Sequence, residues 1–309
     1  MAASDKVLES VLDSPPASPA PITYQWLLPN MRGLENFYKI YNAPQRGSGY
    51  PTPPPSPTND NGPALNTSSY DANAMPSTTS GVDAMDTTTS SVHPPEHEIS
   101  IFLAATESFS QRNTNCSIAE SLQRFTPLIK SARDASLRVR AYISVALGCP
   151  FEGVHVSPTV VADLAASLLS AGADEIAVAD TTGTGTAPRT RELLKALASA
   201  GIRNEDLALH FHDTYGQALL NTLIGLEAGV RTFDAAVGGL GGCPYSPGAT
   251  GNVATEDLVY MLESFGMSTG VDLEGVSEIG DWITRQLGKA NESRAGKGTL
   301  GRLRREAET

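Results

Sequence analysis

Short apolar runs alternate with amphipathic helical segments along most of the chain. Six runs have the length and composition of strands, at residues 22–28, 99–104, 138–147, 175–180, 207–212 and 231–237. Turn residues and a helix-start signal follow these runs. Because strands that alternate with helices favour repeated βα units, the pattern predicts a parallel sheet covered by helices.

Several helix boundaries are marked by capping residues. Ser117 and Glu120 form a capping box, which predicts a helix that continues towards Arg133. Ser157 and Pro158 supply an N-cap and a proline at the first helical position. Similar start signals occur at Pro188 and at Thr214 to Gln217, and glycine stop signals occur at Gly172, Gly201 and Gly229.

The N-terminal third differs in composition from the rest of the chain. Of the 21 prolines, 15 precede residue 98, and residues 43–97 contain ten of them but one basic residue, Arg46. Such a segment cannot bury enough apolar surface to offset the entropy lost on ordering. We therefore expect a disordered N-terminus (1–21), a βα unit (22–42), a disordered insertion (43–97), the main α/β domain (98–290) and a charged C-terminal tail (291–309).

The number of strands predicts an incomplete α/β barrel. A closed TIM (β/α)8 barrel has eight strands and typically about 250 residues. Only six strands are visible, and residues 1–21 are too short and too rich in proline to supply two more βα units. The predicted fold class is therefore α/β, a TIM-type barrel of about six strands interrupted by a long disordered insertion.

Charge and composition exclude several classes of protein. The chain carries 22 basic and 34 acidic residues, for a net charge of −12, which argues against a nucleic-acid partner. No apolar run approaches the roughly 20 residues that cross a bilayer, and no signal or transit peptide is visible at the N-terminus. The three cysteines, Cys116, Cys149 and Cys243, suit reduced thiols. We expect a soluble mitochondrial or cytoplasmic protein without membrane partners.

The strongest chemical signal is the pair His210 and His212 in the predicted strand 207–212. Alternate side chains of a strand share a face, so both imidazoles lie on one side near the C-terminal end of this strand. They could supply two nitrogen ligands to a metal, or they could be two hydrogen-bonded core histidines. Asp213 and Thr214, which follow, are expected to cap the next helix.

A glycine-rich segment with a cysteine follows the last predicted strand directly. Residues 237–252 contain Cys243 among six glycines. The glycines would allow a loop to close over a ligand, although a phosphate cradle or a long turn fits the same pattern. A thiol has an ordinary pKa of about 8.5, so Cys243 is a candidate proton donor or acceptor. A packed, inert cysteine is the alternative.

These segments resemble 3-hydroxy-3-methylglutaryl-CoA lyases. Gly239-Leu-Gly-Gly-Cys-Pro-Tyr245 is similar to the cysteine-bearing signature loop of the family, and the segment that begins at His210 is similar to its metal-binding strand. Further similar segments are residues 29–33, 108–117, 142–150, 180–181 and 251–260. The resemblance covers about residues 22–42 and 98–290, and it implies a lyase on a TIM barrel.

The resemblance also implies a reaction, which is cleavage of a CoA thioester to acetyl-CoA and acetoacetate with the help of Mg²⁺ or Mn²⁺. By motif match, His210, His212 and Asn252 would be metal ligands and Cys243 the proton-transfer residue. Such ligands leave open positions on the cation for substrate oxygens. Asp180 would orient or hydrogen-bond the site, or cap the next helix. The expected partner is the CoA thioester, and a homodimer is compatible with the resemblance.

The chain departs from the family pattern at one place. These lyases begin with a strand that carries Arg-Asp-Gly, whose aspartate is a further metal ligand. The only Arg-Asp pair here, Arg133-Asp134, is followed by Ala135, so the first two βα units are expected to be missing. Three alternatives stay open: a lyase whose sequence record is truncated, a non-catalytic homologue, and a related metal-dependent aldolase or acyl-CoA condensing enzyme.

Overall fold

The computed structural model describes residues 4–16, 22–43, 96–242 and 251–309. The chain divides into two compact units. The first comprises Met1–Ile22 and Phe37–Glu96, and the second comprises Thr23–Asn36 and His97–Thr309. Helix α1 (Ser4–Asp13) belongs to the first unit, and α2 (Met31–Tyr41) spans the boundary between the two. The sheet and the functional side chains belong to the second.

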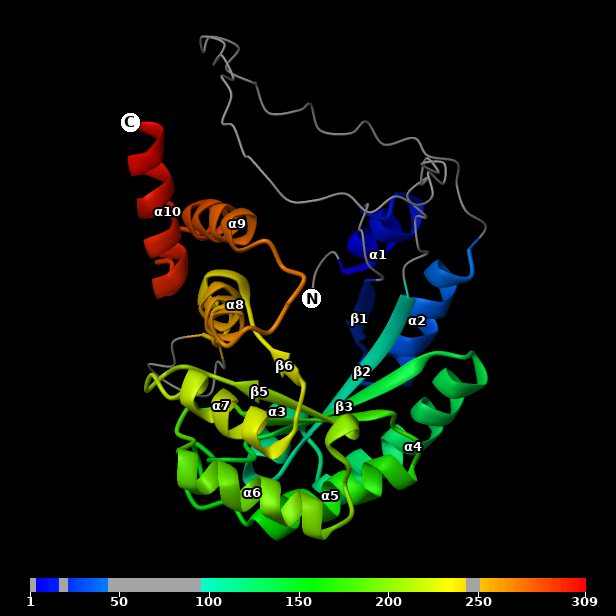
Figure 1. The fold of residues 1–309 in the computed structure, drawn as a ribbon. Coiled ribbons are helices and arrows are strands. Elements are labelled where there is room, and N and C mark those ends of the chain that lie inside the picture. Colours follow the sequence, from blue (N-terminus) through cyan, green and yellow to red (C-terminus); the bar gives the residue numbers. More distant parts are fainter. Residues whose placement is uncertain (1–3, 17–21, 44–95, 243–250) are drawn as a thin grey trace, which may run out of the picture. The chain divides into compact units, whose positions relative to one another are not determined.

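Six strands form one sheet whose order follows the sequence (Figure 1). They are β1 (Thr23–Leu27), β2 (Glu96–Ala104), β3 (Arg138–Ser144), β4 (Glu175–Asp180), β5 (Leu207–Phe211) and β6 (Thr232–Asp234). Pairing is parallel, with Arg140 opposite Glu175 and His210 opposite Asp234. The sheet is a half-barrel of parallel strands, with β1 and β6 at its two edges, which confirms the predicted incomplete TIM-type fold.

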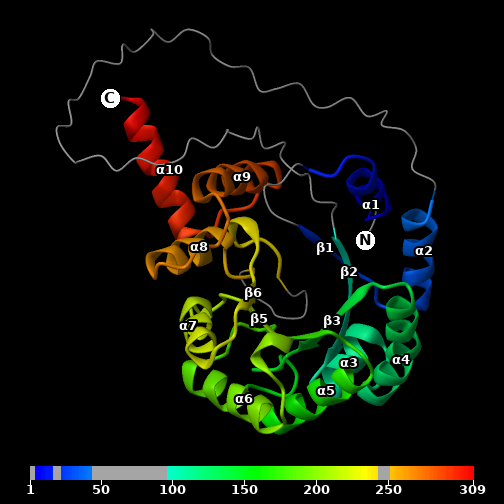
Figure 2. The same ribbon diagram turned by 45° about the vertical axis from the view of Figure 1, so that its right-hand side comes forward.

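Helices cover the outer face of this sheet (Figures 1 and 2). They are α4 (Ile118–Asp134), α5 (Pro158–Ser170), α6 (Ala187–Ser199) and α7 (Ala218–Ala228). In β3, Val139, Ala141 and Ile143 are buried, whereas the residues that alternate with them are partly exposed. The apolar core therefore lies between strands and helices, and β3 presents polar side chains to the opposite, inner face.

The capping signals predicted most helix starts. In α4, Ser117 Oγ accepts the N–H of Glu120 at 3.1 Å, and the Glu120 carboxylate accepts the N–H of Ser117 in return. Pro158 opens α5 as expected. Helix α7 differs from the prediction, because it begins four residues after Thr214. The reason is that the Asp213 carboxylate accepts the N–H of Ala218 and so sets the first helical residue.

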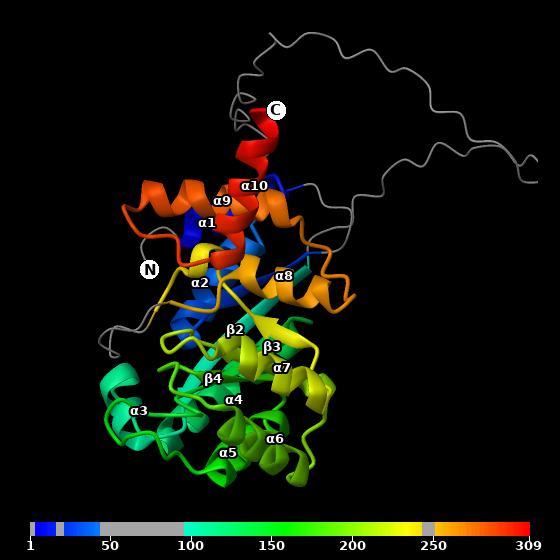
Figure 3. The same ribbon diagram turned by 60° about the vertical axis from the view of Figure 1, so that its left-hand side comes forward.

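The three C-terminal helices pack against one another (Figure 3). They are α8 (Thr255–Ser264), α9 (Leu273–Gln286) and α10 (Arg294–Ala307), and the remaining short elements of the unit are α3 (Glu107–Thr114), η1 (Asn204–Asp206) and η2 (Val237–Gly239). Asp257 joins α8 to the start of α10, because its Oδ1 accepts hydrogen bonds from Ser293 Oγ and the N–H of Ala295. Most of the expected charged tail is thus helical.

Helix α1 lies within the segment that was expected to be a disordered N-terminus, residues 1–21. Four apolar residues, Val7, Leu8, Val11 and Leu12, recur at helical spacing, and Leu8 is buried. The prolines elsewhere in residues 1–21 made this short helical pattern of apolar residues hard to recognise in the sequence. Residues 44–95 of the expected insertion lie outside the described residues. Within the described ranges, no helix has both the length and the apolarity to cross a bilayer.

Candidate active site

A cavity of about 410 Å³ opens on the inner face of the half-barrel. Strands β1 to β3 and β5, the residues around the end of β4, and α3 contribute side chains to its wall. The polar members of the wall include Gln25, Asn113, Tyr142, Thr181, His210 and His212. Its volume is in the range of small-molecule sites, and its position at the C-terminal side of the strands is where TIM-barrel enzymes bind substrates.

The two histidines face this cavity together, as the strand alternation predicted. Their ring centroids are 5.3 Å apart. His212 is only 6 % exposed, and its Nδ1 is buried without a hydrogen-bond partner. Burial, assisted by the neighbouring His210, lowers the pKa of His212 to about 4. The ring of His212 is therefore neutral at physiological pH, which is the form that binds metals.

Asn252 lies next to His212 through an antiparallel bridge between the two residues. Its Nδ2 donates to the carbonyl oxygen of Leu240 at 2.9 Å. The other end of the amide, Oδ1, is buried without a partner. His212 lines the cavity, whereas Asn252 lines a second one together with Asp213 and Thr214. Since an unpaired buried polar atom is costly, Nδ1 of His212 and Oδ1 of Asn252 are the atoms that a ligand would satisfy.

His210 is held by a carboxylate. Its Nδ1 lies 3.1 Å from Oδ2 of Asp234 on the neighbouring strand. Burial opposes ionisation of Asp234, but the hydrogen bond from His210 and the positive charge of Arg140 outweigh it and lower the pKa of this carboxyl. Asp234 is therefore an anion at neutral pH, paired with a cation on one side and an imidazole on the other.

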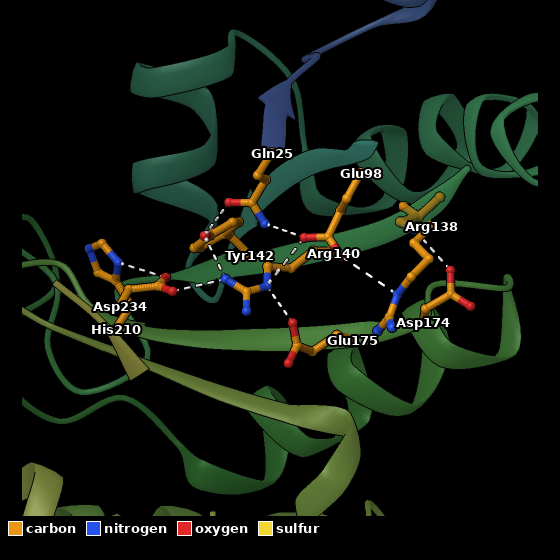
Figure 4. Close-up of polar contacts among 10 residues, drawn as sticks. Gln25, Glu98, Arg138, Arg140, Tyr142, Asp174, Glu175, His210 and Asp234 are labelled. Carbon is orange, nitrogen blue, oxygen red and sulfur yellow. Dashed lines mark hydrogen bonds and ion pairs between the residues drawn. The ribbon is translucent and has the colours of Figure 1, made fainter. Parts of the chain in front are cut away.

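Arg140 is the centre of a buried polar cluster that continues from Asp234 (Figure 4). Its guanidinium lies 2.8 Å from Asp234 Oδ1 and 3.8 Å from Glu98 Oε1, and it also bonds Glu175. The side chain is 11 % exposed, so these charges are largely shielded from water. Burial alone would lower the pKa of Arg140, but the Asp234 and Glu175 carboxylates, with Tyr142, raise it.

Gln25 and Tyr142 close this cluster at the cavity wall (Figure 4). Tyr142 Oη accepts a hydrogen bond from Arg140 at 3.3 Å and donates to Gln25 Oε1 at 2.9 Å. Gln25 Nε2 in turn donates to Glu98 Oε1 at 2.7 Å. Sequence analysis did not identify this cluster. The available signal was the run of polar residues at alternate positions of β3 (Arg138, Arg140, Tyr142 and Ser144), which marks an inner face that is not an apolar core.

Asp180 is not among the residues that line the cavity. Its Oδ2 accepts the N–H of Gly185 at 2.7 Å, so the side chain supports the loop after β4. It does not cap the next helix, because the N-cap residue of α6 is Thr186. Burial raises the pKa of this carboxyl. The contribution of Asp180 to the site comes from its main chain, because its carbonyl oxygen accepts the N–H of His212 at 3.3 Å.

Cys243 lies outside the described residues. Gly242, which precedes it in the sequence, lines the cavity. Gly241 has a φ of +99°, and a Cβ there would come within 2.5 Å of Asn252 Nδ2. Glycine is therefore required at position 241, because its φ is positive and the chain passes so close to Asn252.

Comparison with known proteins gives consistent matches. The HMGL-like family profile matches residues 72–283. Hydroxymethylglutaryl-CoA lyase of Pseudomonas mevalonii is 53 % identical over 209 residues, which are 68 % of this chain and 69 % of the relative. The crystal structure of hydroxymethylglutaryl-CoA lyase from Pseudomonas aeruginosa is similar with a TM-score of 0.74 and 38 % identity, covering 98 % of this chain and 80 % of that one. An HMG-CoA lyase from Acinetobacter baumannii, solved with coenzyme A and 3-methylmalate, has a TM-score of 0.69 and 28 % identity and covers 94 % of this chain and 76 % of its own.

Proposed function

Because the chain belongs to the HMGL-like family, we propose that it cleaves 3-hydroxy-3-methylglutaryl-CoA to acetyl-CoA and acetoacetate. The observation that carries this proposal is a pair of unsatisfied buried atoms, one on His212, which lines the cavity with His210, and one on Asn252, which is bridged to His212. The relative solved with coenzyme A supports a CoA thioester as the substrate.

The side chains present fit a divalent cation, and we assign Mg²⁺ or Mn²⁺ to His210, His212 and Asn252. Two neutral imidazoles and one amide oxygen add no negative charge, so the bound cation retains its full charge. Such a cation supplies Lewis-acid chemistry, acidifying a substrate hydroxyl and polarising a carbonyl oxygen. Among the described residues, no group of three or more His, Cys, Asp or Glu side chains forms an alternative centre.

The cavity wall offers both apolar surface and hydroxyl donors to a substrate. Leu27, Phe102 and Phe109 line it and would exclude water from the acyl portion. Thr181 Oγ1 accepts the N–H of Val145 at 2.8 Å. Since that bond uses a lone pair of the oxygen, the Thr181 hydroxyl can still donate its hydrogen to a substrate oxygen in the cavity.

Carbon–carbon cleavage leaves the acetyl-CoA fragment in need of a proton at its methyl carbon. We assign Cys243 Sγ as the donor. The resemblance of the glycine-rich loop supports this assignment, and so does the place of the adjacent Gly242 in the cavity wall. A thiol is a suitable acid because its ordinary pKa of about 8.5 is close to neutral pH.

The direct test is turnover by the purified 309-residue chain in the presence of Mn²⁺, measured as acetoacetate formed from the methylglutaryl thioester. We expect turnover that Cys243→Ala lowers by on the order of 10²-fold. A chain that binds Mn²⁺ but forms no acetoacetate would contradict the proposal and would be a non-catalytic homologue. Faster cleavage of 4-hydroxy-2-oxo acids would instead indicate a related aldolase.

A further inference from the structure

Asp234 and His210 form a carboxylate–imidazole pair on adjacent strands. The two residues are directly opposite in the register of β5 and β6, and Asp234 Oδ2 lies 3.1 Å from His210 Nδ1. An ionised carboxylate only accepts hydrogen bonds, so this contact requires the imidazole hydrogen to be on Nδ1. Nε2 of His210 then retains the lone pair that a metal ion needs.

The carboxylate is itself restrained from the opposite side. Its other oxygen, Oδ1, accepts a hydrogen bond from Arg140 NH1 at 2.8 Å. Arg140 bonds Glu175 from the same guanidinium and lies 3.8 Å from Glu98. With one oxygen committed to a buried arginine, rotation of the Asp234 carboxylate would break a charged bond, so Oδ2 stays directed at His210.

We propose that Asp234 is the positioning residue of the metal centre, which fixes His210 as the Nδ1–H tautomer and is kept in place by Arg140. The Arg140 cluster then does more than stabilise the fold. Through Asp234, it links charged side chains of β2, β3 and β4 to His210 on β5. This inference rests on the proposed function for the identity of the ligand. The tautomer itself belongs to the metal-free chain and can be measured without any activity.

The first measurement is the tautomer of His210 in the metal-free protein, read from the two ring nitrogens by ¹⁵N–¹H correlation spectroscopy at about pH 8. His210→Gln identifies the resonances. We expect hydrogen on Nδ1 in the parent chain and a shift towards Nε2–H in Asp234→Asn, because an amide can donate to Nδ1. Hydrogen on Nε2 in the parent chain would overturn the proposal, even if the variant did not fold.

The second measurement is the affinity for Mn²⁺ by equilibrium dialysis. Asp234→Asn is expected to weaken binding by about 10- to 100-fold, the usual effect of removing a partner that orients a ligand. Glu175→Gln is the matched control, because it removes another carboxylate from Arg140 but leaves the Asp234–His210 contact intact. It should leave both the His210 tautomer and the affinity nearly unchanged.

The outcomes separate this inference from the proposed function. A parent chain that binds no Mn²⁺ would contradict the metal centre of the proposed function, while the tautomer would still decide whether Asp234 orients His210. A parent chain that binds Mn²⁺ as tightly as Asp234→Asn would contradict the positioning role alone. Equal loss of affinity in Asp234→Asn and Glu175→Gln would also overturn it, since the effect would then come from the charge cluster as a whole.

Discussion

Gly185 donates its N–H to Oδ2 of Asp180 at 2.7 Å, and this bond closes the turn that leads from β4 to α6. A Cβ at position 185 would come within 2.6 Å of that oxygen and 2.9 Å of Leu147 Cδ1. We therefore expect Gly185→Ala to lower the free energy of unfolding by about 1–3 kcal/mol, measured by urea denaturation.

Gly298→Ala is the control for this substitution. Gly298 is exposed in α10, and a Cβ there meets nothing within 4 Å. Alanine should stabilise the helix by about 0.5–1 kcal/mol, because it restricts the unfolded chain more than glycine does. Equal effects of the two alanines would contradict the steric argument for Gly185.

The buried carboxyl of Asp180 predicts a dependence of stability on pH. Burial raises its pKa in the folded chain, so the folded state keeps a proton that the unfolded state releases above its ordinary value of 3.8. The stabilisation linked to this proton is complete below that value and is lost as pH rises through the raised pKa. Relative to the parent, Asp180→Asn should therefore gain stability as pH rises from about 4 to 7. Urea denaturation across that range measures it, and a constant difference would refute the linkage.

His212 is expected to reduce the stability of the metal-free chain, because its buried Nδ1 has no partner. His212→Leu replaces it with an apolar side chain of similar size. The free energy of unfolding without metal should rise by about 1–2 kcal/mol, as expected when an unsatisfied polar group is removed. Added Mn²⁺ should raise the melting temperature of the parent and leave that of the variant unchanged. A variant that is less stable without metal would show that His212 is satisfied by some other contact.

Arg140 is expected to contribute strongly to stability because it neutralises a buried group of carboxylates. Arg140→Leu would leave Glu98, Glu175 and Asp234 close together without their common partner. We expect a loss of about 3–5 kcal/mol in the free energy of unfolding, the usual result when one member of a buried ion pair is removed. Lys130→Ala breaks an exposed pair with Asp134 and should cost no more than about 0.5 kcal/mol. Similar losses in both variants would contradict the role of burial.

Local sequence patterns predicted a strand well where its residues are buried on both faces and a turn marks its end. The strand predicted at residues 175–180 matches β4, because its residues are buried on both sides and end at a clear turn. The strand predicted at residues 231–237 is shorter in the structure, where β6 is Thr232–Asp234 and Val237 begins η2. An edge strand has a neighbour on one side only, so an apolar run by itself overestimates its length.

Part of the candidate site was predictable from the pattern along a single strand. Strand alternation places His210 and His212 on one face, which a sequence shows directly. The contacts of Arg140 were not predictable, because its partner Asp234 is 94 residues away and lies in a different strand. Such contacts depend on how strands align sideways, and periodicity along one strand carries no information about that alignment.

The two ends of the Asn252 amide have opposite hydrogen-bonding properties, because Nδ2 donates and Oδ1 accepts. A carboxylate in its place would attract a cation more strongly, yet it would turn a second oxygen towards the carbonyl of Leu240, which now accepts a hydrogen from Nδ2. Two acceptors would then face each other at a distance suited to a donor and an acceptor. A carboxylate at position 252 would therefore lose the hydrogen bond that holds the start of the glycine-rich segment at Leu240, so the choice of side chain here is set by the folding of a neighbouring turn.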